Sequence, residues 1–397
     1  MTTRQLVIAG GGLTAARAIK SYREAGGEGG IALVGEEATL PYHRPALSKR
    51  YLRGETDATP HVENDEFYRE HGIEVLLETK AAGVDPGSRR LALGNGIQLR
   101  YDKLLVATGA APRRLRVPGS DLDGVFTLRS IADSAAIREA GRAARRAVVV
   151  GGGFIGMEAA ASLRHLGLDV TLIHLGSGLF DVLGARDLSE QLADLYRAHG
   201  VEPLLEEEVA SFAGDGVLRS VQTKSGLRVE ADLAVVGVGV IPNVDFLEGS
   251  GLEVDNGVVV NARFETSAPG VYAAGDVANF FDPLYERHRR IEHWSNATYQ
   301  GTEVGRILAG AEGGYDTVSS FFSEVFGTTI KAFGDVSRFD TLRTDGSLAD
   351  GFLAAYGHEG RLAGAVTVGQ SDELEALVKE LIADRAPADA LERERVG

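Results

Sequence analysis

Two glycine-rich turns of the same kind, far apart along the chain, constrain its fold more than any other feature. The first, Gly10-Gly11-Gly12-Leu13-Thr14-Ala15, follows an apolar run at residues 5–9 and precedes a helical pattern. The second, Gly151-Gly152-Gly153-Phe154-Ile155-Gly156, follows residues 146–150 and again precedes a helical pattern. A strand, a tight glycine turn and a helix, in this order, form the phosphate-binding start of a dinucleotide-binding fold. Two copies therefore predict two dinucleotide-binding sheets in one α/β chain.

Matching landmarks after each turn indicate an internal duplication. Apolar runs at residues 104–107 and 234–238 break into small-residue turns at Thr108-Gly109 and at Gly239, and a proline closes each turn. Two ordinary buried strands would explain the apolar runs but not their matching positions.

Two carboxylates stand at the ends of expected strands. Glu36 follows the strand expected at residues 31–34, where an acidic side chain can accept hydrogen bonds from ribose hydroxyls. Asp276 follows an apolar run at residues 271–274, beside Gly275, and such a position at the carboxyl edge of a sheet is where ligands bind. A solvated turn aspartate would give the same pattern for Asp276.

The composition excludes several kinds of chemistry. The 397 residues include no cysteine, which rules out thiolate metal sites, iron–sulfur clusters bound by this chain, disulfides and thiol nucleophiles. The histidines show no metal-ligand spacing, so we expect no metal. The formal net charge of −16 argues against a nucleic-acid partner, and no apolar run is long enough to cross a membrane. Without a secretory signal, a cytoplasmic location is the expectation.

Together the two turns and two further segments resemble the two-dinucleotide flavoprotein family that contains glutathione reductase. Residues 40–52, LPYHRPALSKRYL, and 292–297, EHWSNA, resemble its cysteine-free branch, the reductases of 2Fe–2S ferredoxins that serve cytochrome P450 and aromatic-ring dioxygenase systems. The resemblance implies two Rossmann-like, glutathione-reductase-like domains and a C-terminal α+β domain. The implied ranges are 1–112 with 242–312 for a discontinuous FAD-binding domain, 113–241 for NAD(P)H, and 313–397 for the C-terminal domain.

The function that this resemblance implies is that of a ferredoxin–NAD(+) reductase type oxidoreductase. Hydride would pass from nicotinamide to flavin N5, and single electrons would leave to a 2Fe–2S ferredoxin. FAD and NADH are the implied cofactors, with NADPH possible, and the chain would be a monomer or weak dimer. The alternatives are an NAD(P)H:quinone or diaphorase-type reductase, an apoptosis-inducing-factor-like flavoprotein, and a slow-turnover flavin redox sensor.

The resemblance also carries over individual site residues. FAD would contact Gly10, Gly12, Thr14, Glu36, Arg44, Lys49, Ala82, Thr108, Gly109, Arg129, Asp276 and Trp294. NAD(P)H would contact Gly151, Gly153, Ile155, Gly156, Glu158, His174 and Gly239.

Lys49 and Glu158 are the implied catalytic pair, because the resemblance places Lys49 near flavin N5. A surface lysine after a proline-rich loop is the alternative for Lys49. Glu158 itself stands in an apolar helix and needs a partner, for which Lys49 is the candidate. Trp294, the one tryptophan, would lie at the flavin edge or else be a core aromatic.

His174 departs from the family pattern. In NADH-dependent relatives this strand ends in a glutamate that binds the adenine ribose, and an arginine follows. Here the strand expected at residues 169–173 ends in His174, and residues 175–178 are LGSG. The sequence shows neither a ribose carboxylate nor an arginine pair for a 2′-phosphate. We expect NADH, because a 2′-phosphate would find no nearby cation.

Docking of an acidic ferredoxin requires a local basic patch on a chain of such negative charge. Candidates are residues 113–116, Arg-Arg-Leu-Arg, and residues 287–290, Arg-His-Arg-Arg. The second lies close to Trp294 in the sequence, so we expect docking near Arg289 and Arg290, with a solvated loop as the alternative.

Two features near the C-terminus complete the predictions. Phe322 stands where relatives often have a tryptophan, which makes electron exit less favourable or the acceptor different. Residues 372–392 predict an amphipathic helix and tail with Leu374, Ala376, Leu377 and Leu381 on one face.

Overall fold

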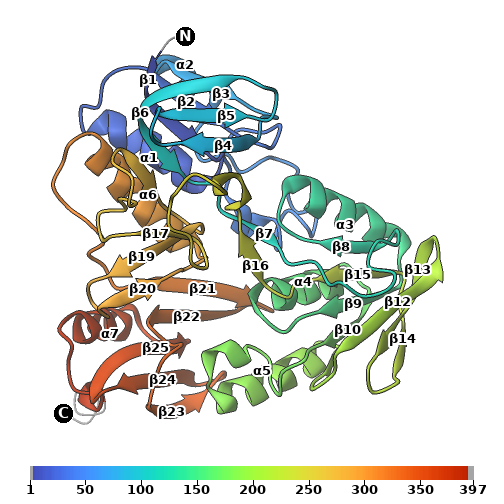
Figure 1. The fold of residues 1–397 in the computed structure, drawn as a ribbon. Coiled ribbons are helices and arrows are strands. Elements are labelled where there is room, and N and C mark those ends of the chain that lie inside the picture. The colour runs from blue at the N-terminus through green and yellow to red at the C-terminus, as the bar shows by residue number, and fades with distance from the viewer. Residues whose placement is uncertain (1–2, 392–397) are drawn as a thin grey trace. The chain divides into compact units, whose positions relative to one another are not determined.

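The structure is a computed structural model that describes residues 3–391 and divides into two compact units (Figure 1). Unit 1 comprises Met1–His43, Thr59–Ala111 and Ile241–Thr317, and unit 2 comprises Arg44–Ala58, Pro112–Val240 and Val318–Gly397. Residues 1–2 and 392–397 of the expected domains, and the end of the expected C-terminal tail, lie outside the described residues.

Unit 1 is built on a sheet in the order β3-β2-β1-β6-β5-β4, with β18 also paired to β6. The pairs β1–β2, β2–β3, β1–β6 and β6–β18 are parallel. The elements of this sheet and its helices are β1 (Thr3–Ala9), α1 (Leu13–Glu24), β2 (Ile31–Val34), α2 (Asp65–Glu70), β3 (Ile73–Leu76), β4 (Ala81–Asp85), β5 (Arg90–Leu93), β6 (Gln98–Val106), β18 (Val271–Ala273) and α6 (Trp294–Leu308). A smaller sheet joins β17 (Val258–Val260), β19 (Ala278–Asp282) and β20 (Arg287–Arg289).

Helices α1 and α6 pack closely because α6 carries glycines at the contact. A Cβ on Gly301 would lie 2.6 Å from the Thr14 carbonyl oxygen, and one on Gly305 would lie 2.4 Å from that of Ala18. Only glycine permits this approach of two backbones. The start of α1, which carries the first glycine turn, is thereby held against α6.

Unit 2 repeats the plan with a parallel sheet in the order β11-β10-β9-β15-β8. Its elements are β8 (Val125–Thr127), α3 (Ile131–Ala143), β9 (Arg146–Val150), α4 (Phe154–His165), β10 (Asp169–Ile173), α5 (Arg186–Ala198), β11 (Val201–Leu204) and β15 (Leu233–Val236), with 3-10 turns at Arg44–Ala46 and Asp181–Leu183. In both sheets the strand order reverses beside the strand that precedes the glycine turn, which is where ligands bind in open α/β sheets. The α/β class and the two Rossmann-like sheets expected from the sequence are confirmed.

Two antiparallel sheets complete unit 2. One contains β12 (Val209–Asp215), β13 (Val217–Thr223) and β14 (Arg228–Glu230). The other has the order β21-β22-β25-β24-β23 and carries α7, with bounds β21 (Ser320–Val325), β22 (Thr328–Gly334), β23 (Thr341–Ser347), β24 (Gly351–His358), β25 (Arg361–Val368) and α7 (Asp372–Ala383).

The chain crosses between the units within β7 (Ala110–Pro112) and β16 (Val240–Pro242), and also after His43, Ala58 and Thr317. The C-terminal sheet belongs to the same compact unit as the second parallel sheet. The division into three domains, each with its own dinucleotide or role, stays a prediction. Among the described residues, none of the helices combines the length and apolar character needed to span a bilayer.

Candidate functional site

The first glycine turn, in unit 1, has the geometry of an anion-binding helix start. Gly10 has a φ of +123°, and a Cβ there would lie 2.1 Å from the Ala107 carbonyl oxygen, so the turn lies directly against the end of β6. Gly12 is the N-cap of α1, which has neither a side-chain cap nor an acidic residue in its first turn. The N–H groups at this helix start can therefore bind a phosphate, and the turn fits a dinucleotide pyrophosphate.

The same corner of unit 1 gathers Thr14 and the Gly275-Asp276 pair. The Thr14 hydroxyl donates to the Ala297 carbonyl oxygen at 3.2 Å. Gly275 has a φ of +81°, and a Cβ on it would lie 2.4 Å from Thr14 Oγ1. The carboxylate of Asp276 thus follows a glycine that touches the first turn, at the end of β18, where the sequence pattern expected a ligand position.

The other predicted FAD residues of unit 1 lie on several parts of its sheet. Thr108 is tied to Asn243 by two hydrogen bonds of 2.8 and 2.9 Å. Glu36 is exposed at the end of β2, with its Oε1 3.7 Å from Lys80 Nζ. Ala82 is exposed on β4.

Trp294 begins α6 and is 36% exposed. Its indole N–H donates to His43 Nδ1 at 2.9 Å, and the two ring centroids are 5.7 Å apart. Burial lowers the pKa of His43, and the Arg17 charge lowers it further, so His43 stays neutral and can accept this bond. Burial also lowers the pKa of the adjacent His293 to about 4, although the Asp276 carboxylate opposes this shift. Trp294 is thus a partly exposed aromatic rather than a core residue.

The second glycine turn, in unit 2, repeats the first. Gly151 has a φ of +113°, and a Cβ on it would lie 2.3 Å from the Gly237 carbonyl oxygen. A Cβ on Gly156 would lie 1.9 Å from the Gly151 carbonyl oxygen, so this glycine allows α4 to approach β9. Gly153 caps α4 without a side-chain hydrogen bond and without an acidic first turn. This turn therefore also fits a pyrophosphate. Of the other residues predicted to contact NAD(P)H, Ile155 is exposed and Gly239 has a φ of +97°.

Lys49 and Glu158, predicted as a pair, are in contact in unit 2. Lys49 Nζ lies 2.6 Å from Glu158 Oε2, and Glu158 is 5% exposed. The Ser48 hydroxyl donates to Oε2 at 2.5 Å, and the Ser323 hydroxyl donates to Oε1 at 2.7 Å. A buried carboxylate is tolerated when it is paired and hydrogen-bonded, and Glu158 meets both conditions. The two serines were not identified from the sequence, because neither stands in a motif that predicts contact with Glu158.

The two predicted FAD arginines of unit 2 also come together. Arg44 Nη1 donates to the Arg129 carbonyl oxygen at 2.7 Å, and the Arg129 N–H donates to Asp133 at 3.0 Å. Asp133 in turn forms a capping box with Ser130 at the start of α3. The Arg44 guanidinium therefore lies against the backbone of Arg129, where its positive charge can serve an anionic group.

His174 follows β10, as predicted, and a carboxylate that the sequence pattern missed lies beside it. His174 Nε2 is 3.2 Å from Asp181 Oδ2. The strand β10 does not end in an acidic residue, and for this reason the sequence showed no carboxylate for the adenine ribose. Asp181 is brought there by the intervening glycine-rich loop, and its spacing from the strand matches no standard fingerprint.

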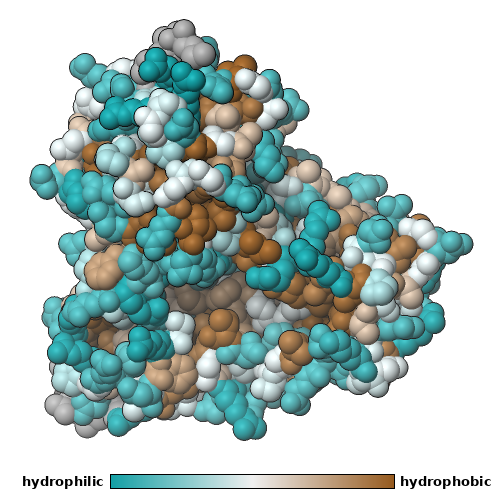
Figure 2. All heavy atoms as spheres, in the orientation of Figure 1, coloured by the Kyte–Doolittle hydropathy of each residue, from teal (hydrophilic) through white to brown (hydrophobic). Residues whose placement is uncertain are grey.

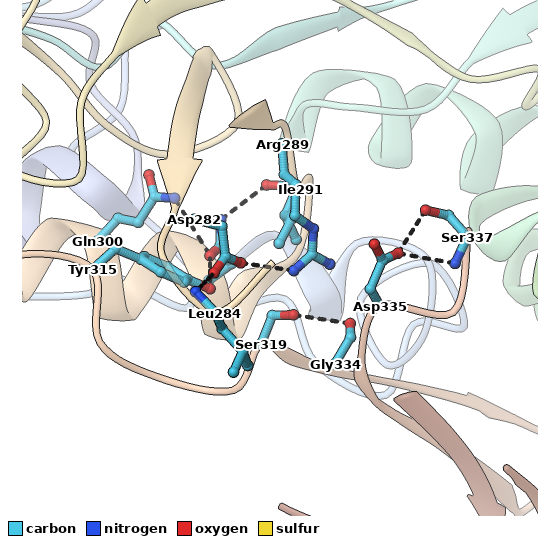
Figure 3. Close-up of polar contacts among 11 residues, drawn as sticks. Asp282, Leu284, Arg289, Ile291, Gln300, Tyr315, Ser319, Gly334, Asp335 and Ser337 are labelled. Carbon is cyan, nitrogen blue, oxygen red and sulfur yellow. Dashed lines mark hydrogen bonds and ion pairs between the residues drawn. The ribbon is translucent and has the colours of Figure 1, made fainter. Parts of the chain in front are cut away.

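Arg289 and Arg290, the cations near which we expected docking, do not form an exposed basic patch. Arg289 Nη1 pairs with Asp282 Oδ2 at 2.8 Å, and the two side chains are 8% and 1% exposed (Figure 3). Arg290 is 10% exposed and pairs with Glu292. Burial raises the pKa of Asp282, and the Arg289 charge opposes this shift. Both cations are neutralised inside unit 1, since an unpaired buried charge would be too costly.

The other candidate basic segment is exposed. Arg113, Arg114 and Arg116 are all exposed in unit 2, as is Phe322 on β21. Within residues 3–391 no group of three or more acidic or histidine side chains is placed to hold a metal ion.

Known proteins resemble the chain over almost its full length. Residues 4–301 match the family model described as pyridine nucleotide-disulphide oxidoreductase. The benzene 1,2-dioxygenase system ferredoxin–NAD(+) reductase subunit of Pseudomonas putida is 35% identical over 83% of this chain and 80% of its own. Putidaredoxin reductase CamA of Pseudomonas putida is 32% identical over 97% of this chain and 93% of its own. A crystal structure of the covalent putidaredoxin reductase–putidaredoxin complex matches with a TM-score of 0.92 and 32% identity, covering 98% of this chain and 94% of that one.

Proposed function

The chain belongs to the pyridine nucleotide-disulphide oxidoreductase family, and from this membership we propose that it is an FAD-dependent NADH:ferredoxin reductase. It would take electrons from NADH and deliver them to a 2Fe–2S ferredoxin that serves a P450 or dioxygenase system. The named relatives are ferredoxin–NAD(+) reductases and a putidaredoxin reductase, which is the direct support for this activity.

One observation carries the proposal within this chain. Two glycine turns, each at a helix start with no side-chain cap, are present in a sequence without a single cysteine. Two pyrophosphate sites fit two dinucleotides, and a chain without thiols has no disulfide of its own to reduce. Electrons must therefore leave to another molecule.

The residues have distinct proposed tasks. The backbone N–H groups after Gly12 and after Gly153 hold the two pyrophosphates, and Arg44 and Arg129 add positive charge toward FAD. When bound, FAD supplies the chemistry that accepts two electrons from nicotinamide and releases them one at a time. Thr14, Thr108, Asp276 and Trp294 are also assigned to FAD by the family resemblance.

Lys49 is the proposed catalytic cation, and Glu158 orients it. Because Glu158 accepts from Lys49, Ser48 and Ser323 at once, its carboxylate cannot rotate away without losing several charged hydrogen bonds. A fixed ammonium stabilises negative charge that develops nearby during reduction.

We also propose where the ferredoxin binds. We place ferredoxin docking at the exposed Arg113, Arg114 and Arg116, because the alternative cations at 289–290 are buried in ion pairs. An acidic ferredoxin fits such a segment by charge. The monomeric or weakly dimeric state and the cytoplasmic location stay predictions.

The test compares electron acceptors. The purified, FAD-loaded chain is supplied with NADH, and the steady-state rate is measured with a 2Fe–2S ferredoxin, with a quinone and with ferricyanide as a partner-independent control. The proposal expects kcat/KM to be higher for ferredoxin than for the quinone. A higher value for the quinone would favour a diaphorase-type enzyme, and slow turnover with all three would favour a redox sensor.

A further inference from the structure

We propose that His174 and Asp181 together recognise the unphosphorylated adenine ribose of the coenzyme and so make the enzyme prefer NADH over NADPH. This inference rests on the proposed function and assigns a carboxylate to a position where the sequence shows none. Asp181 takes the role that an acidic strand-end residue has in other dinucleotide folds.

The loop after β10 places Asp181 at the second glycine turn. The Phe180 N–H donates to the Gly152 carbonyl oxygen at 2.9 Å, which ties the residue before Asp181 to the turn itself. Phe180 adopts a φ of +55°, which is unfavourable for a residue with a side chain and is maintained by this contact. The carboxylate therefore lies at the carboxyl end of β10 although it is distant in sequence from the strand.

Gly176 shows how closely the loop folds around this carboxylate. A Cβ on Gly176 would lie 1.7 Å from Asp181 Oδ2 and 2.7 Å from His174 Nε2. Its φ is not in the left-handed region, so the backbone conformation alone does not demand glycine here. What demands glycine is the position of the Asp181 and His174 side chains.

His174 is oriented by the same turn. The Gly152 N–H donates to His174 Nδ1 at 3.1 Å, so in the neutral ring the proton is on Nε2. Nε2 lies 3.2 Å from Asp181 Oδ2, yet it makes no aligned hydrogen bond within the described chain. Nε2 is buried and faces the carboxylate of Asp181, so the pair presents a carboxylate acceptor, and the Asp181 side chain is 41% exposed.

This pair has the chemistry of a ribose diol site. A ribose hydroxyl can donate to the Asp181 carboxylate, which His174 holds in place, whereas a 2′-phosphate would face the Asp181 charge. The neighbouring pocket is lined by Ser177, Glu190, Asp194 and Arg197, among others. Arg197 is already paired with Asp194 at 2.9 Å, so this pocket offers no uncompensated cation to a phosphate.

Apolar side chains stand next to each member of the pair. Leu175 follows His174 and is 66% exposed, and Val182 follows Asp181 and is 57% exposed. Exposed aliphatic groups beside a polar pair suit the adenosine half of a dinucleotide, which joins an apolar base to a polar ribose.

The test measures coenzyme binding and use in the oxidised holoenzyme. Calorimetry gives the Kd of NAD+ and NADP+, and ferricyanide reduction gives kcat/KM for NADH and NADPH. In Asp181→Asn we expect the Kd of NAD+ to rise roughly tenfold, as for loss of a hydrogen bond to a charged group, with the Kd of NADP+ unchanged or lower. Because the hydride-transfer residues are untouched, kcat with NADH at saturation should stay within about twofold.

Two further variants separate recognition from general effects. Gly176→Ala keeps every charge but displaces the Asp181 carboxylate, so it should weaken NAD+ binding as Asp181→Asn does. Asp169→Asn makes the same chemical change at the other end of β10, where the carboxylate is 85% exposed, and should leave both Kd values within about twofold.

The outcomes are distinguishable. A wild-type enzyme that binds NADP+ as tightly as NAD+, or an Asp181→Asn variant that keeps the wild-type ratio of Kd values, would overturn the inference. If the Kd values change as expected but neither coenzyme supports turnover, the proposed reductase function is wrong while the recognition pair stands.

Discussion

At the scale of single residues, Glu158 is a buried charged group of unit 2 with three partners. Its two oxygens accept from Lys49, Ser48 and Ser323 within 2.7 Å. The sequence indicated the need for a partner, because a carboxylate in an apolar helix requires one. It could not identify Ser323, because β21 is remote in sequence and a serine on a strand is usually just a surface residue.

Removing the charge of Glu158 should affect reduction more than folding. For Glu158→Gln we expect FAD content near that of the wild type and reduction by NADH slowed by about 10–100-fold, since Lys49 loses the group that orients it. For Ser323→Ala, which deletes one hydrogen bond, we expect a slowing of about fivefold. Stopped-flow absorbance of the flavin at saturating NADH measures both rates.

A serine that holds a different carboxylate provides the control. Ser337 donates to Asp335 at 2.6 Å in the same unit (Figure 3). Ser337→Ala should leave the reduction rate unchanged. An unchanged rate in Glu158→Gln would remove Glu158 from the site.

His293 should titrate near pH 4 rather than at its ordinary value. Burial lowers its folded-state pKa to about 4, while the unfolded value is about 6.5. Between these values the unfolded chain binds the proton and the folded chain does not, so stability is lost as pH falls from about 6.5 to 4. A histidine NMR resonance, assigned by its loss in His293→Gln, reports the titration. A resonance that titrates near pH 6.5 would contradict the lowered pKa.

The stability measurement is the second test. The drop in Tm between pH 7 and pH 5 should be smaller in His293→Gln than in the wild type.

At the scale of elements, buried parallel strands were predictable almost to the residue. The bounds of β2, β9, β10 and β18 agree with the apolar runs, because such strands read as short continuous apolar segments between glycine turns. Helix α4 begins at Phe154, which lies within the glycine turn at residues 151–156, whereas the sequence predicted a helix only after this turn.

The buried face of α7 was not predictable from hydrophobicity. The sequence favoured a face with Leu374 and Ala376, but Ala376 is exposed, and the buried residues are Glu375, Val378 and Ile382. Glu375 is buried because Lys331 on β22 pairs with it at 2.7 Å. A polar residue that is buried by a distant ion pair shifts the helix face in a way that an apolar pattern cannot indicate.

The contact between α1 and α6 gives a prediction at this scale. Gly305→Ala should destabilise the protein by about 1–3 kcal/mol, because its Cβ would lie 2.4 Å from a backbone oxygen of α1 and the helices must separate. Denaturant unfolding followed by circular dichroism measures this loss, and FAD release should occur at lower denaturant.

Gly141→Ala in α3 is the matched control. A Cβ there would meet only Leu166 Cδ1 at 3.8 Å, an ordinary contact, and alanine favours a helix by up to about 1 kcal/mol over glycine. We expect equal or greater stability. If Gly305→Ala were as stable as Gly141→Ala, this result would contradict the close packing of α1 against α6.

At the scale of the whole molecule, the net charge of −16 limits where an acidic partner can approach. Hydrophilic residues cover much of the visible face, with hydrophobic residues in smaller groups among them (Figure 2). The sequence alone does not show which cations are exposed, because ion pairs with Asp282 and Glu292 bury Arg289 and Arg290. Only the fold shows which arginines stay exposed, and those at 113, 114 and 116 do.

Reversing charge at the exposed arginines should therefore impair ferredoxin reduction selectively. In Arg113→Glu combined with Arg114→Glu, we expect the rate constant for ferredoxin to fall about tenfold at low salt and to depend less on ionic strength, because electrostatic steering is lost. Ferricyanide reduction should stay at the wild-type rate, since it bypasses ferredoxin docking. Arg142→Glu combined with Arg228→Glu makes the same change in net charge at two other exposed arginines of unit 2 and should have a much smaller effect. Equal losses in both double variants would mean that net charge, rather than the segment at 113–116, governs the approach of the partner.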